Sequence, residues 1–235
     1  STPIAKYIYE TGTKNGKRLQ ALGGAKNHMV ILPDADLDMA ANALMGAAYG
    51  SAGECCMAIS VAVPVMDKVA DALIKRLVPK IEALKVGPAA DRSSEMGPVV
   101  TKAAQEKILG LIDKGEAEGA KVVVDGRGFT LPQGYENGFF VGPTLIDNVT
   151  PEMTVWREEI FGPVLSVVWL KDYAAAVDLI HAHDYANGVA VFTRDGDAAR
   201  TFAHDIEVGM VGVSVPTPVP IAFHSFGGWK QCKHP

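Results

Sequence analysis

The sequence has few cysteines and no long basic or apolar run, and each scarcity narrows the class of protein. Three cysteines in 235 residues, two of them adjacent, do not make a disulfide framework and suit a reducing compartment. No lysine–arginine run stands out and the net charge is −5, which disfavours nucleic acid and anionic membranes as partners. The apolar runs are too short to cross a bilayer, and no signal peptide opens the chain. We therefore expect a soluble, cytoplasmic protein.

Other patterns are missing as well. The chain contains no G-x-G-x-x-G fingerprint for a dinucleotide, no internal repeat and no low-complexity tract. It opens on a helix start, with Ser1 as N-cap and Pro3 in the first turn, and it stops soon after a loop at Phe226-Gly227-Gly228. These ends predict a piece of a longer protein.

Apolar, β-branched segments alternate with segments of helical periodicity along the chain. The expected strands are 17–22, 29–32, 59–65, 121–124, 139–141, 164–170, 189–193 and 209–215. A short apolar run at 145–146 follows the strand at 139–141. The expected helices are 3–11, one from 33–36, one from 67 that Pro79 should kink or split, 101–114, one from 150–151, 173–181 and 197–204. Continuous apolar strands that alternate with helices predict an α/β fold with a mostly parallel sheet covered by helices on both faces.

The stretch Gly53-Glu54-Cys55-Cys56-Met57-Ala58 lies between an alanine-rich helical segment and the apolar strand 59–65. A thiol at such a junction is held by rigid elements and can face a cleft. A helix end or a strong hydrogen-bond environment there can lower the pKa of the thiol and favour the nucleophilic thiolate. Taken alone, the stretch fits a structural, buried cysteine better, because free cysteine is among the most buried residue types.

Several patterns together resemble one family. The aldehyde dehydrogenase superfamily has, in this order, elements similar to Gly53–Cys56, to Glu159-Ile160-Phe161-Gly162-Pro163 and to Phe226–Lys230. Further segments resemble its CoA-acylating branch, methylmalonate-semialdehyde dehydrogenase, and these are Gly24–His28, Gly209–Val213 and Pro216–Pro220. The similarity runs over essentially residues 1–231. It implies the catalytic-domain fold of that superfamily.

The resemblance also implies roles for single residues. Cys56 would attack the aldehyde carbon, a hydride would pass to NAD, and the thioacyl group on Cys56 would pass to coenzyme A. The backbone N–H of Cys56 would be one donor to the oxyanion. Glu159 would hold the ribose hydroxyls on the nicotinamide side of NAD, Phe161 would pack near the nicotinamide ring, and Ser1 would face the cofactor pyrophosphate. No metal ion is implied, and the full-length family suggests a homo-oligomer acting on a small-molecule aldehyde.

Each of these residues also has a structural interpretation. Glu159 could be a carboxylate in the first turn of a helix, stabilised by the macrodipole, and Phe161 could be a core aromatic. Cys55 and Cys56 could form a strained vicinal disulfide. The histidines have no metal-like spacing with the cysteines, so we expect them to be structural or exposed (His28, His181, His183, His204, His224).

Two positions depart from the family pattern. Leu22 stands where hydrolytic aldehyde dehydrogenases carry the glutamate that activates water, which favours acyl transfer to a thiol such as CoA. Cys55 stands where the branch has an arginine that can pair with a substrate carboxylate, which weakens the case for a carboxylated semialdehyde.

Three hypotheses of different classes follow from these patterns. The preferred one is the catalytic thiol portion of a CoA-acylating semialdehyde dehydrogenase. In it, residues 1–22 end a dinucleotide-binding domain, 23–215 form the thiol domain and 216–235 are a truncated return segment. The second is an inactive fragment that only associates with like subunits, and the third is a thiol redox protein that uses Cys55 and Cys56. A generic hydrolytic aldehyde dehydrogenase is a further alternative within the family.

Overall fold

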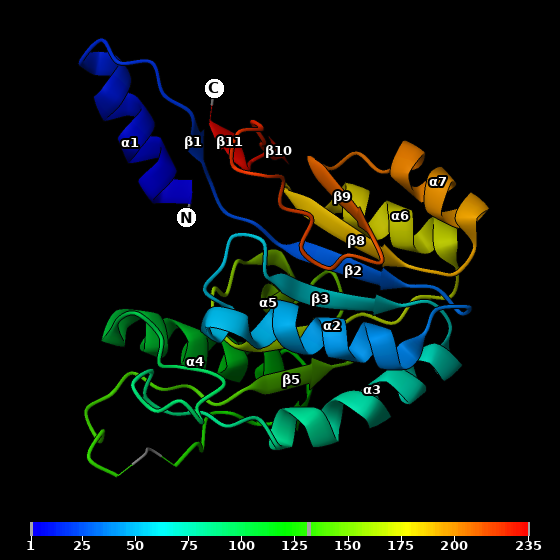
Figure 1. The fold of residues 1–235 in the computed structure, drawn as a ribbon, viewed down its shortest axis with the longest axis horizontal. Helices are drawn as coiled ribbons and strands as arrows, with labels where there is room; N and C mark the ends of the chain where they lie inside the picture. Colours follow the sequence, from blue (N-terminus) through cyan, green and yellow to red (C-terminus); the bar gives the residue numbers. More distant parts are fainter. Residues whose placement is uncertain (1, 131–132, 235) are drawn as a thin grey trace.

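The chain folds around one seven-stranded sheet in the computed structural model, which describes residues 2–130 and 133–234 (Figure 1). The strand order is β4-β5-β6-β3-β2-β8-β9. β4 pairs antiparallel with β5, and every other pair of neighbours in this sheet is parallel. Its strands are β2 (Asn27–Ile31), β3 (Ile59–Pro64), β4 (Lys121–Val124), β5 (Thr144–Asp147), β6 (Val164–Val167), β8 (Gly188–Phe192) and β9 (Met210–Val213).

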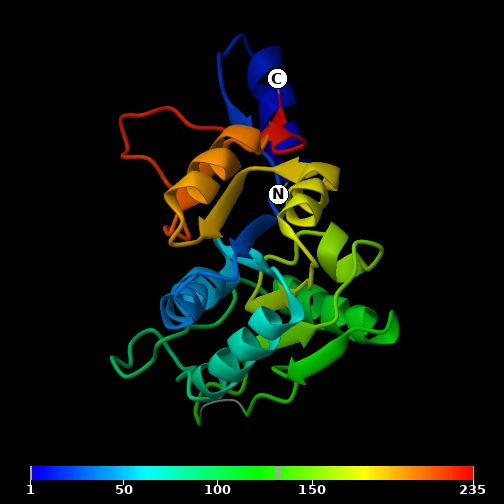
Figure 2. The ribbon, with the colours of Figure 1, turned by 90° about the vertical axis from the view of Figure 1, so that its right-hand side faces the viewer.

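Helices flank this sheet on both faces, which confirms the predicted α/β class (Figures 1 and 2). α2 and α3 lie side by side against β3, and α7 packs against β8 and β9. The helices are α1 (Thr2–Lys14), α2 (Leu37–Tyr49), α3 (Asp67–Glu82), α4 (Lys102–Ala117), α5 (Thr154–Arg157), α6 (Tyr173–Ala182) and α7 (Gly196–Asp205). β2 and β8 are buried along their whole length, as expected for central parallel strands with covered faces.

Most helix starts follow the capping signals of the sequence. The Asp36 side chain accepts hydrogen bonds from the backbone N–H groups of Asp38 and Met39 at the start of α2. Thr101 and Asp172 cap α4 and α6 in the same way. These caps fix where each helix leaves the edge of the sheet.

Several predicted elements differ from the structure. Pro79 does not split α3, because Leu77 and Ile81 on either side of it are fully buried and outweigh one lost hydrogen bond. The predicted strand 139–141 is irregular, and the following apolar run forms β5 instead. The expected helix at 150–151 begins only at Thr154. The predicted strand 164–170 is regular only through Val167.

Two small antiparallel sheets tie the end of the described chain to earlier segments. β1 (Ala21–Leu22), which is shorter than the predicted strand 17–22, pairs with β11 (Lys233–His234). β7 (Tyr185–Ala186) pairs with β10 (Trp229–Lys230). α1 stands apart from the main sheet (Figure 1). Within the described ranges, no helix has both the length and the apolar character that a membrane span needs.

Candidate active site

The cysteine pair lies on the connection from α2 to β3, at the amino edge of the parallel strands. After α2 the chain makes a short 3₁₀ turn, η1 (Gly50–Gly53), in which Ser51, Ala52 and Gly53 have φ angles of 52°, 52° and 71°. Left-handed residues in series are uncommon and reverse the chain sharply. They bring Cys55 and Cys56 back toward the start of β3.

Gly53 makes a close backbone contact with the segment that carries Glu159 and Phe161. A Cβ atom at Gly53 would lie 2.0 Å from the carbonyl oxygen of Gly162. Only glycine permits this approach together with a positive φ. The contact joins the two parts of the sequence that carry the family patterns.

We expect Gly53→Ala to lower the free energy of unfolding by about 2–4 kcal/mol, because it adds both a clash and backbone strain. Urea unfolding measures the change. The matched control is Gly46→Ala within α2, where an added Cβ meets nothing within 4 Å. Equal stabilities of the two variants would contradict the contact.

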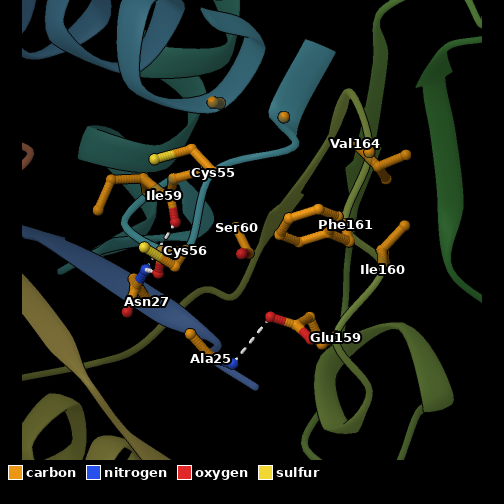
Figure 3. Close-up of a pocket in the computed structure, with 14 residues that line it drawn as sticks. Ala25, Asn27, Cys55, Cys56, Ile59, Ser60, Glu159, Ile160, Phe161 and Val164 are labelled. Carbon is orange, nitrogen blue, oxygen red and sulfur yellow. Dashed lines mark hydrogen bonds between the residues drawn. The ribbon is translucent and has the colours of Figure 1, made fainter. Parts of the chain in front are cut away.

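One pocket brings together Cys56, Glu159 and Phe161 (Figure 3). The two thiols lie on one side of this pocket, and Glu159 and Phe161 lie on the other. Ala25 and Asn27, at the start of β2, complete the wall. The enclosed space measures about 10 Å³, which is room for about one water, so an aldehyde has to reach Cys56 from the open side.

The three cysteines have different environments. Cys55 and Cys56 are exposed free thiols, whereas Cys232 is buried and 2% exposed. Burial raises the pKa of Cys232 to about 11. Partial burial also raises the pKa of the Cys56 thiol, and the charge of Cys55 and a hydrogen bond with it act in the same direction. The lowered pKa considered from the sequence is therefore not found in this structure, because desolvation of the sulfur, followed by the effects of Cys55, outweighs the backbone hydrogen bond that lowers it.

Glu159 is held by backbone and lysine contacts. Its Oε1 accepts a hydrogen bond from the Ala25 N–H at 2.9 Å, and Lys107 donates to its carbonyl oxygen at 2.8 Å. Lys26, which is buried, donates to the carbonyl of Glu158 at 2.9 Å, and burial lowers the pKa of Lys26 to about 7. Glu159 follows the C-terminus of α5, so the alternative reading as a first-turn helix carboxylate is wrong.

Phe161 and the remaining predicted residues are placed as follows. Phe161 has a φ of 58° and is 40% exposed, so it is not a core aromatic. Ser1 lies outside the described residues; α1 begins at Thr2, whose Oγ1 accepts a hydrogen bond from the Gly24 N–H at 3.0 Å. Leu22 is half-buried on β1 and is not among the residues that line the pocket.

A cavity of about 810 Å³ adjoins Glu159 on the side of α1. Its charged lining residues are three cations and three carboxylates, namely Lys6, Lys107, Arg157, Glu158, Glu159 and Asp184. The cationic side chains can pair with phosphate oxygens and a carboxylate can accept from a ribose diol, so the cavity holds the two kinds of group that a dinucleotide needs. In the part of the chain that the structure describes, no group of three or more His, Cys, Asp or Glu side chains is arranged to hold a metal.

His28 and His183 pack around Trp156 in the core, which confirms a structural position for both. Trp156 Nε1 donates to His28 Nε2 at 3.1 Å, and the His183 ring bonds the Trp156 carbonyl at 3.0 Å. Burial lowers the pKa of His28 well below its usual range and that of His183 to about 4. Both rings are therefore neutral in the folded protein at neutral pH.

These shifts predict loss of stability in acid. Below pH ~6.5 the unfolded chain binds protons that the folded chain does not, so the free energy of unfolding falls by up to about 1.4 kcal/mol per pH unit for each histidine. The contribution of His183 to this fall in the free energy of unfolding continues down to about pH 4, where the folded protein also binds the proton. Urea unfolding at pH 7 and pH 5 measures it. We expect His183→Gln to have a shallower pH dependence than His224→Gln, an exposed control; equal slopes would contradict the assignment.

Sequence reasoning missed two residues of this site. The side-chain amides of Asn27 and Asn187 both donate to the Cys56 carbonyl at 2.9 Å. Both are buried polar residues, Asn27 as the first residue of β2 and Asn187 directly before β8, and their place beside an apolar run was the available signal.

Comparison with known proteins agrees with the fold. The sequence profile of the aldehyde dehydrogenase family matches residues 1–234. The malonate-semialdehyde dehydrogenase of Pseudomonas aeruginosa is 65% identical over 231 residues, which is 98% of this chain and 46% of the relative. Malonate-semialdehyde dehydrogenase 2 of Geobacillus kaustophilus is 45% identical over 98% of this chain and 47% of its own length. The chain thus spans about half the length of the curated relatives it matches.

Solved structures give the same result. A Sinorhizobium meliloti 1021 protein, assigned as a methylmalonate-semialdehyde dehydrogenase and crystallised with NAD, is 62% identical with a TM-score of 0.96. The methylmalonate-semialdehyde dehydrogenase of Oceanimonas doudoroffii is 58% identical, also with a TM-score of 0.96. Each of these two alignments covers 100% of this chain and 48% of the chain in the solved structure. The chain belongs to the aldehyde dehydrogenase family.

Proposed function

We propose that this chain carries the catalytic thiol of an NAD-dependent, CoA-acylating semialdehyde dehydrogenase. The observation that carries the proposal is the shared pocket of the Cys56 thiol and the Glu159 carboxylate, which come from distant segments joined at Gly53. The substrate class is malonate or methylmalonate semialdehyde. The product is acetyl-CoA or propionyl-CoA after loss of CO₂.

Each residue has a defined task in this mechanism. The Cys56 sulfur, once deprotonated, forms a bond to the aldehyde carbon, and the Cys56 N–H faces the resulting oxyanion. NAD, when bound, supplies the hydride acceptor. Glu159 binds a ribose diol with the lone pairs that Ala25 leaves free, and Phe161 presents its ring to the same pocket. The thiol of CoA then takes the acyl group, and Cys56 leaves as the free thiol.

Three features support CoA over water as the acyl acceptor. Leu22 has no proton-accepting group at the position where the hydrolytic family members have a glutamate. Glu159 lies on the wall of the pocket opposite the thiols and accepts a hydrogen bond from the Ala25 N–H, so it does not take the place of the missing glutamate beside Cys56 (Figure 3). The relatives with high identity are named for malonate or methylmalonate semialdehyde, and the resemblance links dehydrogenases of this substrate class to acyl transfer. The same proposal includes a homo-oligomeric assembly, which the family resemblance favours. It also includes a cytoplasmic location, because free cysteines suit a reducing compartment.

A chimera tests the proposal. This chain would replace the 231 matched residues of the Pseudomonas aeruginosa relative, which supplies the rest of the family length. With NAD, malonate semialdehyde and CoA, we expect NADH and acetyl-CoA to form in equal amounts. Formation of free acid in place of acetyl-CoA would contradict the acylating assignment, and absence of NADH in a folded chimera would contradict the dehydrogenase assignment.

Cys55→Arg in the chimera tests substrate preference. A guanidinium beside Cys56 can pair with the substrate carboxylate, so we expect KM for malonate semialdehyde to fall about tenfold, the value of one charge-assisted contact. KM for propanal, which has no carboxylate, should stay the same. An equal change for both aldehydes would show that position 55 does not contact the carboxylate.

A further inference from the structure

Cys56 occupies a central position of a tight turn. The N–H of Ala58 donates to the carbonyl of Cys55 at 2.9 Å, so Cys56 and Met57 are the two middle residues. The peptide between two such residues has two common orientations, which differ by a rotation of more than 100° in ψ of the first residue. The turn closure alone therefore does not fix the direction of the Cys56 carbonyl.

Two asparagine amides fix this direction. Asn27 Nδ2 and Asn187 Nδ2 each lie 2.9 Å from the Cys56 carbonyl oxygen. Asn27 is the first residue of β2, and Asn187 lies between β7 and β8. Asn27 is 2% exposed and Asn187 is 8% exposed, so water does not compete well for these bonds. Both lone pairs of the carbonyl are thereby used.

The asparagines are themselves held in place. The Gly188 N–H donates to Asn27 Oδ1 at 3.0 Å, and because an N–H can only donate, the oxygen of Asn27 must face it. The second hydrogen of Asn27 Nδ2 reaches the Ala58 carbonyl at 2.9 Å. Asn187 Nδ2 also contacts Met57 Sδ at 3.1 Å. The amides are thus oriented by neighbours on both sides of the turn.

We propose that Asn27 and Asn187 are positioning residues that lock the Cys56–Met57 peptide in one orientation and so keep the Cys56 thiol and N–H aimed at the pocket. The proposal rests on the proposed function for its catalytic consequence. The contact itself does not depend on any activity. A carbonyl freed from one amide would let the turn exchange between orientations, and the thiol would spend part of its time misaligned.

The contact can be observed in this chain by NMR. Cys56-Met57 is the single Cys-Met pair of the sequence, so labelling cysteine with ¹³C at the carbonyl and methionine with ¹⁵N gives one cross peak, from that peptide. We expect Asn187→Leu, which removes one donor at similar volume, to move the Cys56 carbonyl resonance upfield and to broaden the peak. An unmoved, sharp peak would overturn the proposed lock.

The consequence is measured in the chimera. Because small misplacements of a reacting group cost about 10- to 100-fold in rate, we expect Asn187→Leu to lower kcat by that factor, with KM values within about threefold. The control is Gln105→Leu, since the Gln105 amide also donates to a backbone carbonyl, that of Phe140 at 2.7 Å, away from Cys56. A kcat loss in Asn187→Leu no larger than in the control would overturn the positioning role.

A second variant, Asn27→Asp, tests the same contact in case Asn187→Leu does not fold. Asn27→Asp keeps an oxygen to accept from Gly188 but, when ionised, has no donor for Cys56. It should show the same upfield shift and a loss of kcat.

If the shift occurs but the unmutated chimera makes no NADH, the proposed function fails and the peptide lock stands. If the unmutated chimera is active and neither variant shifts the peak, the lock is wrong and the function stands.

Discussion

Cys56→Ser in the chimera is expected to lower kcat for NADH formation by at least about 10⁴-fold, because a serine hydroxyl is a far weaker nucleophile without an adjacent base. No histidine is among the residues that line the pocket around Cys56, and its carboxylate, Glu159, lies on the wall opposite the thiols and accepts from the Ala25 N–H, so the serine would have no adjacent base. The measurement is steady-state NADH production with excess CoA and aldehyde. Thermal unfolding of the variant should be nearly unchanged, since the side chain is exposed.

The neighbouring thiol is the matched control. Cys55 is also exposed and lines the same pocket, yet its Sγ accepts a hydrogen bond from the Met57 N–H and is not the proposed nucleophile. We expect Cys55→Ser to keep kcat within about tenfold of the unmutated chimera. If Cys55→Ser and Cys56→Ser lose the same large factor, both thiols are needed for the reaction and the assignment of Cys56 as the single nucleophile fails.

Omission of CoA is expected to lower steady-state NADH production by about 10² to 10⁴, because the thioester on Cys56 then has only unassisted water to accept the acyl group. The first turnover should proceed and the following ones should stall. Leu22→Glu should restore part of the flux as free acid, and Gln20→Glu, an exposed control just before β1, should not. Equal turnover with and without CoA, with free acid as product, would favour a hydrolytic aldehyde dehydrogenase.

Much of the fold follows from local sequence signals. Asp36 caps α2 as predicted, and β4 occupies the predicted residues, because capping and strand periodicity act over a few residues. β1 and β11 are two residues each and pair across almost the whole chain, so no local pattern reveals them. Pro79 shows the opposite error, where a strong local signal is outweighed by packing of α3 against the core.

The site was predictable where a pattern is contiguous and not where it is assembled in space. The Cys55–Cys56 stretch stands out in the sequence, as does the segment that contains Glu159. The raised pKa of Cys56 depends on burial and on neighbours that only the fold supplies. Asn27 and Asn187 converge on one carbonyl from segments far apart in the sequence, and neither has a spacing that marks it.

The raised pKa of Cys56 has a consequence for the pH profile. Deprotonation of the thiol in the unliganded protein occurs above its usual range, so reaction with a thiol reagent should be slow at neutral pH and rise with pH. A cation placed near the sulfur, such as the guanidinium of Cys55→Arg, should shift this rise to lower pH.

The most direct test of the account is the mass of the enzyme after a single turnover. The chimera would be incubated with NAD and propanal in the absence of CoA, quenched in acid, digested and mapped. The account predicts a propionyl group on the peptide that contains Cys55 and Cys56, located on Cys56 by fragmentation, and its loss as propionyl-CoA when CoA is added before the quench. An acyl group on Cys55, or NADH formation without any acylated peptide, would contradict it.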